Sequence, residues 1–555
     1  MTETITIYCK NNKQYHEVPI GSSLMELYKA AGAPLRYAPV NALVNNKTQG
    51  LTYRCWQPKD VEFQDCTSQS GLRTYVRSLC HILAKAVNDV LPSATMNLEH
   101  AVSKGYYCMI HNGKKVDQPT IDAIKSRMKE LVEADLPFIH RSARTEEAIL
   151  LFRKRGMEDK ARLIESAGMA YTSYYDLDGY INFFYGCLTP STGFIRVFDL
   201  LPYCEGVLLR IPSKANPLEM EPFIRQDKMF EVFKEHLTLQ RTLEMDNVSD
   251  LNRAVQGGHA SEIIMVSEAM QEKQIAKIAE QIALGYEQGV RIVLISGPSS
   301  SGKTTFAKRL AVQLITHLLH PVSISLDDYF LNRTDTPKDE SGDFDFESLY
   351  ALDLPYFNQD MARLLEGKEI NLPAYSFTAG TRVYKGDTLA LREKSVLMIE
   401  GIHALNPELT GHIDARYKYK VYVSALTAIS LDNHNWIPTT DNRLLRRIIR
   451  DHRFRGYSAK DTIARWTSVR KGEDKWIFPY QETADVMFNS ALLYELAVLR
   501  PYAEPVLREV REFDRENAEA CRLMRFLKYF STIPAEELPG TSLLREFLGG
   551  GKFHY

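Results

Sequence analysis

The sequence predicts a multidomain protein that combines α/β and α+β folds. Its 555 residues exceed the roughly 250 to 300 at which a single hydrophobic core stops growing. A glycine-rich loop near residue 300 lies between an apolar strand and an amphipathic helix, which is typical of a parallel sheet that binds phosphate. Residues 1–66 instead show short strands separated by turn residues, so a small β-rich module is expected to precede the α/β part.

Composition excludes several classes of protein. Hydrophobic residues make up 45% and charged residues 25% of the chain, close to the average of soluble globular proteins. The 68 basic and 70 acidic residues leave a net charge of -2, so a nucleic acid would have to be bound by a local patch. The eight cysteines form no disulfide framework, the start of the chain carries an acid, and no apolar run approaches ~18 residues. We therefore expect a cytoplasmic protein without a signal peptide or membrane segment.

Residues 1–66 are predicted to form a strand-and-helix module. Residues 4–9 alternate as a strand, Ser23 is an N-cap for the helix that follows it, and residues 42–46 are typical of a strand and a turn. The stretch Ala42-Leu43-Val44-Asn45-Asn46 resembles the A-x-V-N-G motif of TGS domains. That resemblance implies the ubiquitin-like β-grasp found at the start of threonyl-tRNA synthetases.

Residues 67–215 resemble the editing domain of threonyl-tRNA synthetases, which implies an α+β fold. The segments that carry the resemblance are His81–Val87, Met128–Val132, Asp135–Phe138 and Pro190–Gly193. The family's H-x-x-x-H and C-x-x-x-H motifs, which could hold zinc, keep one residue of four: His81 remains, whereas the other three positions are Arg77, Phe184 and Leu188. A lone histidine beside an apolar helix face is typical of a core residue. We therefore expect no catalysis here, while an RNA, a nucleotide or a protein partner of this half stays open.

The remaining chain divides into three predicted segments. Residues 216–287 are rich in Glu, Lys, Gln and Met with isoleucines at helical spacing, and are expected to be a helical linker. Residues 288–495 hold the phosphate loop and are expected to be a kinase-type α/β domain with a parallel sheet. Residues 496–555 show apolar helical spacing, for example at Leu507, Val510 and Phe513, and are expected to be a packing appendage.

The phosphate loop is the most specific motif in the chain. Residues 297–304 fit G-x-x-x-x-G-K-[ST] between a buried strand at 291–296 and an amphipathic helix. Backbone N–H groups of such a loop surround phosphate oxygens, Lys303 reaches the β and γ phosphates of ATP, and the Thr304 hydroxyl can ligate Mg²⁺. The predicted nucleotide-binding residues are Gly297, Pro298, Ser299, Ser300, Ser301, Gly302, Lys303, Thr304 and Thr305.

Carboxylates follow two further predicted strands. Asp327 and Asp328 come after the run 322–326, and Glu400 ends the run 395–399. The carboxyl ends of parallel strands meet at the ligand edge of an open sheet. Thr304, Asp327 and Glu400 are therefore predicted to organise Mg²⁺.

Six arginines lie between residues 441 and 455: Arg443, Arg446, Arg447, Arg450, Arg453 and Arg455. A solvated basic face would explain such a cluster. A lid that neutralises a transferring phosphoryl group would explain it as well.

Residues 288–495 resemble the uridine-cytidine kinase and phosphoribulokinase group of P-loop kinases. Besides the loop and the arginines, the carriers are Asp327–Phe330, the stretch from Phe344-Asp345 to Asp353, Pro373–Phe377, and Glu400-Gly401-Ile402. The resemblance implies that Asp327 accepts the proton of the substrate hydroxyl, with Asp328 as the alternative. It also implies that Arg443, Arg446 and Arg447 form a lid, and that Asp345, Tyr375 and Arg382 contact the substrate.

Two positions depart from the pyrimidine-reading pattern: Ser376 replaces an aspartate, and Gly380 stands where a histidine helps to read the base. Losing a polar partner for the base costs about 1–3 kcal/mol in binding, enough to change selectivity. The predicted function is an ATP- and Mg²⁺-dependent kinase of a small hydroxyl compound, most readily a uridine-like nucleoside, in a homo-oligomer. The alternatives are a kinase of a non-nucleoside hydroxyl compound and an RNA- or tRNA-associated regulatory P-loop NTPase.

Overall fold

The N-terminal module is a five-stranded sheet with one helix. In the computed structural model, which describes residues 3–339, 342–376 and 379–554, its strands are ordered β2-β1-β7-β4-β5. Ser23 begins α1 with a capping box, and the positive φ of Asn45 and Asn46 makes the tight turn between β4 and β5. The elements of this module are β1 (Thr4–Cys9), β2 (Gln14–Pro19), β3 (Ser22–Ser23), α1 (Leu24–Ala31), β4 (Asn41–Val44), β5 (Lys47–Gly50), β6 (Arg54–Cys55) and β7 (Lys59–Gln64).

The second module has an α+β fold with two sheets, ordered β13-β14-β9-β8 and β10-β11-β12. The long helix α2 buries His81 and the apolar residues around it. The elements are α2 (Gln69–Val90), β8 (Thr95–Val102), β9 (Gly105–His111), α3 (Gln118–Glu133), β10 (Ile139–Arg144), α4 (Thr145–Lys154), α5 (Glu158–Ser166), β11 (Tyr171–Leu177), β12 (Tyr180–Asn182), β13 (Asp199–Tyr203) and β14 (Gly206–Arg210).

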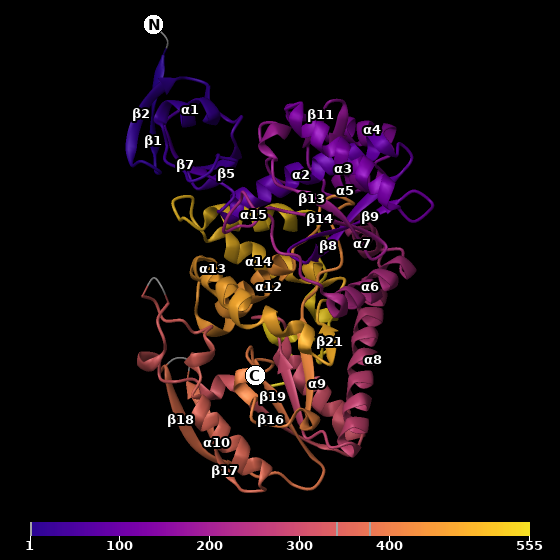
Figure 1. Ribbon diagram of the computed structural model, residues 1–555, viewed down its shortest axis with the longest axis vertical. Helices are drawn as coiled ribbons and strands as arrows, with labels where there is room; N and C mark the ends of the chain where they lie inside the picture. Colours follow the sequence, from indigo (N-terminus) through magenta and orange to yellow (C-terminus); the bar gives the residue numbers. More distant parts are fainter. Residues whose placement is uncertain (1–2, 340–341, 377–378, 555) are drawn as a thin grey trace.

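Three helices lead from this module to the next: α6 (Asp227–Thr242), α7 (Val248–Gln256) and α8 (Ala260–Glu287). The longest, α8, runs along one side of the lower half of the molecule (Figure 1). Its residues Ile275, Ile278 and Ile282 are buried against the strand and helix that flank the phosphate loop. None of the helices in the described ranges is long and apolar enough to cross a lipid bilayer.

The third module is built on a five-stranded, all-parallel sheet ordered β16-β19-β15-β20-β21. This confirms the predicted fold class. The phosphate loop follows the central strand, and a two-stranded hairpin, β17–β18, projects from the module (Figure 1). The elements are β15 (Ile292–Ser296), α9 (Lys303–Thr316), β16 (His320–Ser325), α10 (Leu354–Leu365), β17 (Ile370–Ser376), β18 (Thr381–Leu389), β19 (Ser395–Glu400), α11 (Pro407–Thr410), β20 (Lys418–Ser424), α12 (Thr439–Arg450), α13 (Ala459–Trp476) and β21 (Val486–Asn489).

The C-terminal segment corrects one expectation. It was predicted to be a packing appendage, but its helices α14 (Glu495–Arg508) and α15 (Asn517–Leu527) share the core of the molecule with α4, α5 and α12. The short helix α16 (Arg545–Leu548) lies at the phosphate loop. Phe513, expected on the apolar face, lies between α14 and α15 and is 93% exposed, because the helix ends at Arg508.

A buried ion pair joins the second and third modules. The Lys160 ammonium on α5 lies 2.7 Å from the Asp432 carboxylate, and both side chains are fully buried. The shared core and this pair join the N-terminal half to the half that carries the phosphate loop.

Candidate active site at the phosphate loop

The phosphate loop connects β15 to α9 in a conformation that needs its small residues. Gly302 has a φ of +83°, and a Cβ at this position would lie 2.4 Å from Leu543. A Cβ at Gly297 would lie 1.9 Å from the Val423 carbonyl oxygen on the neighbouring strand β20. Both glycines are therefore required for the loop to fold back over the sheet edge.

Several polar groups of the loop are buried without partners. The hydroxyl groups of Ser300 and Ser301 find no hydrogen-bond partner among the described residues. The Lys303 ammonium lies along the loop, 3.3 Å from the Pro298 carbonyl oxygen. A buried polar group without a partner is costly, so a loop of this kind is suited to a ligand that supplies acceptor oxygens.

The predicted magnesium-organising residues come together at one edge of the sheet. The Thr304 hydroxyl donates to the Glu400 carboxylate over 3.4 Å. In the sheet register Glu400 is opposite Ile295 on one side and Ser325 on the other, two residues before Asp327. Burial raises the pKa of Glu400 to about 7, against the opposing effect of Lys303, and Asp327 is close enough to raise it further.

Asp327 and Asp328 lie in a short 3-10 helix, Leu326–Tyr329, directly after β16. Their side chains nevertheless have different surroundings. The Asp328 carboxylate accepts the Tyr375 backbone N–H over 3.1 Å, and burial raises its pKa. Asp327 instead acts electrostatically on Glu400, Glu347 and Arg455, so it belongs to the charged group around the loop.

The arginine cluster lies on α12 and the π-helical turn Asp451–Arg455. Arg443 is buried in an ion pair with Glu473 and donates to the Ser299 carbonyl oxygen over 3.1 Å. Arg446 is buried in an ion pair with Glu495. In this structure both side chains are fixed by buried ion pairs and brace the loop, and the lid role of these two arginines stays a prediction.

Arg447 is positioned differently. Its guanidinium remains 15% exposed and donates to the Ser299 hydroxyl over 2.8 Å. It is also paired with Asp451, one turn further along. A lid-like role stays a prediction for Arg447.

Each of the three predicted substrate residues has a structural partner, and their contact with a substrate stays a prediction. The Asp345 carboxylate accepts the Glu347 backbone N–H over 3.2 Å, and the ring of Tyr375 packs on Phe330. Arg382 pairs with Asp353 at 3.1 Å and donates to the Tyr329 and Phe330 carbonyl oxygens. Phe377, part of the predicted motif, lies outside the described residues.

The space beside Gly380 is filled by the Arg333 side chain. The Arg333 side chain packs so closely that a Cβ on Gly380 would lie 2.9 Å from its Nε atom. The position where relatives are expected to carry a base-reading histidine is therefore filled by an arginine from another segment.

Four glutamates at the site were missed by the sequence reasoning. Glu473 and Glu495 pair with the bracing arginines, and Glu347 has a buried carboxylate oxygen without a partner among the described residues. Burial raises the pKa of Glu347 to about 7, with Lys303 and Arg447 opposing. Glu546 of α16 accepts both the backbone N–H and the hydroxyl of Thr305, over 3.1 and 2.7 Å. No local motif marks any of the four.

The module that carries the phosphate loop is similar to known kinases. Residues 292–494 match the model of the Phosphoribulokinase / Uridine kinase family. A uridine kinase of Lactobacillus helveticus is 29% identical over 198 residues, which are 35% of this chain and 84% of that enzyme. A solved structure of a possible uridine kinase from Bacillus stearothermophilus is 21% identical, with a TM-score of 0.26, and covers 36% of this chain and 89% of its own.

The N-terminal half is similar to a different family. The threonine–tRNA ligase of Syntrophomonas wolfei is 26% identical over 215 residues, which are 39% of this chain. The chain spans about a third of the length of that ligase, 33%. Residues 292–494 thus match the phosphoribulokinase/uridine kinase family, in a chain whose N-terminal half is similar to threonine–tRNA ligases.

Proposed function

We propose that the protein is an ATP-dependent kinase that transfers a phosphoryl group to a hydroxyl of a small substrate. The observation that carries this proposal is the convergence of Lys303, Asp327 and Glu400 at one sheet edge. A cation, a carboxylate free to accept a proton and a second carboxylate for a metal are the groups that phosphoryl transfer to a hydroxyl requires.

The residues present fit ATP and Mg²⁺. The unpartnered hydroxyls of Ser300 and Ser301 and the N-terminus of α9 suit phosphate oxygens, and Lys303 suits their charge. Thr304, Glu400 and Asp327 would hold Mg²⁺, which when bound neutralises charge on the phosphate oxygens. Arg443 and Arg446 keep the loop backbone in place, because each donates to one of its carbonyl oxygens.

Asp327 is the proposed proton acceptor. It follows β16 at the ligand edge, and the neighbouring Asp328 is engaged by Tyr375. The task of Asp327 is to orient the acceptor hydroxyl and take its proton as the phosphoryl group is transferred. Arg447 would stabilise charge on that group from the side of Ser299.

A nucleoside similar to uridine is the first choice for the acceptor, supported by the family and by the similarity to a uridine kinase. The Arg333 side chain beside Gly380 favours a second candidate. A guanidinium near the acceptor position suits a hydroxyl compound that carries a negative group, because such a compound offers paired acceptor oxygens.

The test is an acceptor screen with the purified full-length chain, ATP and Mg²⁺. Production of ADP is measured with nucleosides, sugars, polyols and their phosphorylated or carboxylated forms. A single class of acceptor that raises the rate at least tenfold identifies the substrate class. ATP hydrolysis that no acceptor stimulates would contradict the kinase proposal and favour the regulatory NTPase.

We also propose that the N-terminal half holds a nucleotide or an RNA. Its similarity to threonine–tRNA ligases supports this, although His81 is enclosed by aromatic rings. A homo-oligomer and a cytoplasmic location stay predictions, which size-exclusion chromatography with light scattering and cell fractionation would check.

A further inference from the structure

A large cleft lies where three parts of the chain meet, away from the phosphate loop. Its volume is about 1340 Å³, and its walls come from the β-grasp module, from α2 and the loops beside it, and from helices α13 and α15. Among the described lining residues, twelve lysines and arginines face six aspartates and glutamates. The chain as a whole carries a net charge of -2, so this excess of positive charge is local. A cleft lined by one sign of charge attracts ligands of the opposite sign.

Arg77 on α2 is the most informative lining residue. Its guanidinium fits against Gly186, where a Cβ would lie 1.4 Å from an Nη atom, and its Nε donates to the Arg73 carbonyl oxygen over 3.1 Å. No carboxylate of the described residues forms an ion pair with it. Burial lowers the pKa of Arg77, against the opposing effect of Cys187, Tyr185 and Tyr175. The side chain is only partly buried, so the guanidinium stays accessible from the cleft, and an anion there would be its counter-ion.

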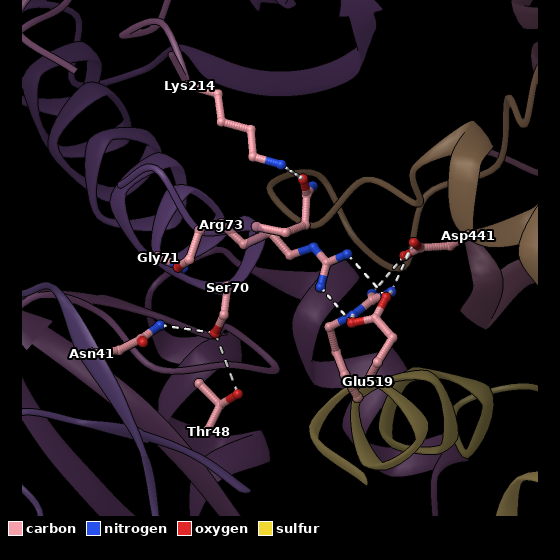
Figure 2. A network of polar contacts seen from close by, with 11 residues as sticks. Asn41, Thr48, Ser70, Gly71, Arg73, Lys214, Asp441 and Glu519 are labelled. Carbon is pink, nitrogen blue, oxygen red and sulfur yellow. Dashed lines mark hydrogen bonds and ion pairs between the residues drawn. The ribbon is translucent and has the colours of Figure 1, made fainter. Parts of the chain in front are cut away.

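Other cations surround the same space. The Lys214 ammonium donates to the Gln69 side-chain carbonyl over 3.4 Å (Figure 2). Desolvation and the positive charges of Arg73, Arg470 and Lys471 lower the pKa of Lys214. These arginines and lysines come from both halves of the chain, and an anion between them would relieve their mutual repulsion.

The wall of the cleft also contains a charged network that reaches the kinase-type module. Arg73 forms two hydrogen bonds with Glu519, of 2.7 and 3.0 Å, and Arg522 bridges Glu519 to Asp441 (Figure 2). Asp441 lies on α12, two residues before Arg443, which braces the phosphate loop. An anion that competed with Glu519 for Arg73 would therefore act on a helix that contacts the active site.

We propose that this cleft binds a phosphate-bearing ligand, with Arg77 and Lys214 as its phosphate contacts. Arginine pairs with phosphate through two parallel N–H···O bonds, and lysine adds a point charge. The volume is far larger than a single phosphate needs, so the ligand is a nucleotide or the end of an RNA. The proposal rests on the inference that the N-terminal half keeps such a ligand, and it assigns the site and its chemistry.

The test uses the full-length chain with Lys303→Ala, so that the phosphate loop contributes little to binding and catalysis is not a readout. Two probes, inorganic pyrophosphate and a single-stranded RNA of twelve nucleotides, are titrated at low salt by calorimetry. We expect at least one probe to bind saturably, and Arg77→Met with Lys214→Met to weaken that binding at least tenfold. Lys129→Met removes the same charge from the exposed face of α3, outside the cleft, and should bind like the parent.

Thermal unfolding separates a ligand contact from a structural role. Because Arg77 is unpaired, Arg77→Met should leave the melting temperature without probe equal or higher, and should abolish the rise that the probe causes. If Arg77→Met fails to fold, Lys214→Glu, at an exposed residue, replaces it in the titration. Binding of pyrophosphate identifies a small phosphorylated ligand, and binding of RNA alone identifies a nucleic acid.

Two results would overturn the proposal. One is that neither probe binds the folded protein at millimolar concentration. The other is that the cleft variants and Lys129→Met bind equally well. Both are independent of the acceptor screen, which uses the chain with Lys303 intact.

Discussion

The phosphate loop and the surroundings of His81 both lie where a resemblance to a known family would place a site, but they are built in opposite ways. At the loop, polar groups without partners, such as the hydroxyls of Ser300 and Ser301, are held in place by buried ion pairs behind them. At His81, the ring is enclosed by Phe138, Tyr180 and Phe184 at 5.5 to 5.9 Å between centroids. Its Nε2 atom lies 3.3 Å from the Tyr180 carbonyl oxygen, so the histidine is part of the core.

This difference shows how an active site can be told apart from a module that keeps only the fold of one. Both modules contain buried polar atoms without a partner among the described residues, but of different kinds. At the loop they are serine hydroxyls beside the Lys303 ammonium, whereas at His81 the atom is the Nδ1 of a ring enclosed by aromatic side chains. Leu188 and Phe184 belong to the hydrophobic core around α2, where they replace groups that could bind a ligand. The unsatisfied charge of the N-terminal half is instead found one helical turn away, at Arg77.

The largest expected effect is that of Lys303→Ala. Removing a cation that stabilises developing phosphoryl charge typically lowers kcat by about 10³- to 10⁵-fold. We expect a loss of this size in steady-state kinetics, with an unchanged circular dichroism spectrum. If the folded variant turned over substrate as fast as the parent, the loop would have no role in the mechanism. The phosphate loop would then be as inactive as the surroundings of His81.

Asp327→Asn should lower kcat by about 10²- to 10⁴-fold, the usual contribution of a general base, with a smaller effect on the KM for ATP. Asp328→Asn is the matched neighbour. It should have a milder effect, because the Asp328 carboxylate accepts a backbone N–H and an amide oxygen can do the same. Equal losses in both variants would assign the effect to damage of the 3-10 helix.

Glu546→Gln tests the carboxylate that occupies the donors of Thr305. A nucleotide phosphate needs these donors, so we expect the KM for ATP to fall by about tenfold when the negative charge is removed, equivalent to about 1.4 kcal/mol. Glu537→Gln, on the same segment but bonded to Ser261, should leave the KM unchanged. A higher KM for Glu546→Gln would show that the carboxylate supports the loop.

His81→Leu gives the smallest effect and addresses the other site. Burial lowers the pKa of His81 to about 3, so below pH 6.5 the unfolded chain binds a proton that the folded chain does not. Proton binding by the unfolded chain destabilises the folded state, and this destabilisation is nearly absent at neutral pH and grows as the pH falls. The unfolding free energy of the variant minus that of the parent should therefore be about 1 kcal/mol larger at pH 5.5 than at pH 7.5.

Thermal unfolding at the two pH values measures this difference, and packing changes cancel because they are the same at both. Kinase activity should stay at the parent level, since His81 lies outside the kinase-type module. The same pH dependence in parent and variant would contradict a neutral, buried His81.

Local signals in the sequence were enough for much of the fold and part of the site. The capped helix after Ser23, the turn at Asn45-Asn46 and the strand, loop and helix around Lys303 each depend on neighbouring residues, and all three were predicted. The meeting of Glu400 with Thr304 was also predictable, because both follow adjacent parallel strands.

The missed features depend on residues far apart in the chain. Glu473 pairs with Arg443 across 30 residues and Glu495 pairs with Arg446 across 49, so neither partner is visible from local spacing. The cluster of six arginines looked exposed in the sequence because the same segment holds only two acids, Asp441 and Asp451. The surroundings of Arg77 likewise combine α2 with residues of α13 and α15.

The contact between Glu546 and Thr305 has a consequence for biosynthesis. The two residues are separated by 241 positions, and Leu543 of the same segment fills the space beside Gly302. At roughly 5–20 residues per second, a ribosome that has completed the loop needs tens of seconds more to produce its last structural partner. During that interval the nascent chain carries a phosphate loop that no carboxylate yet occupies, so nucleotide could reach the loop before the finished protein closes over it.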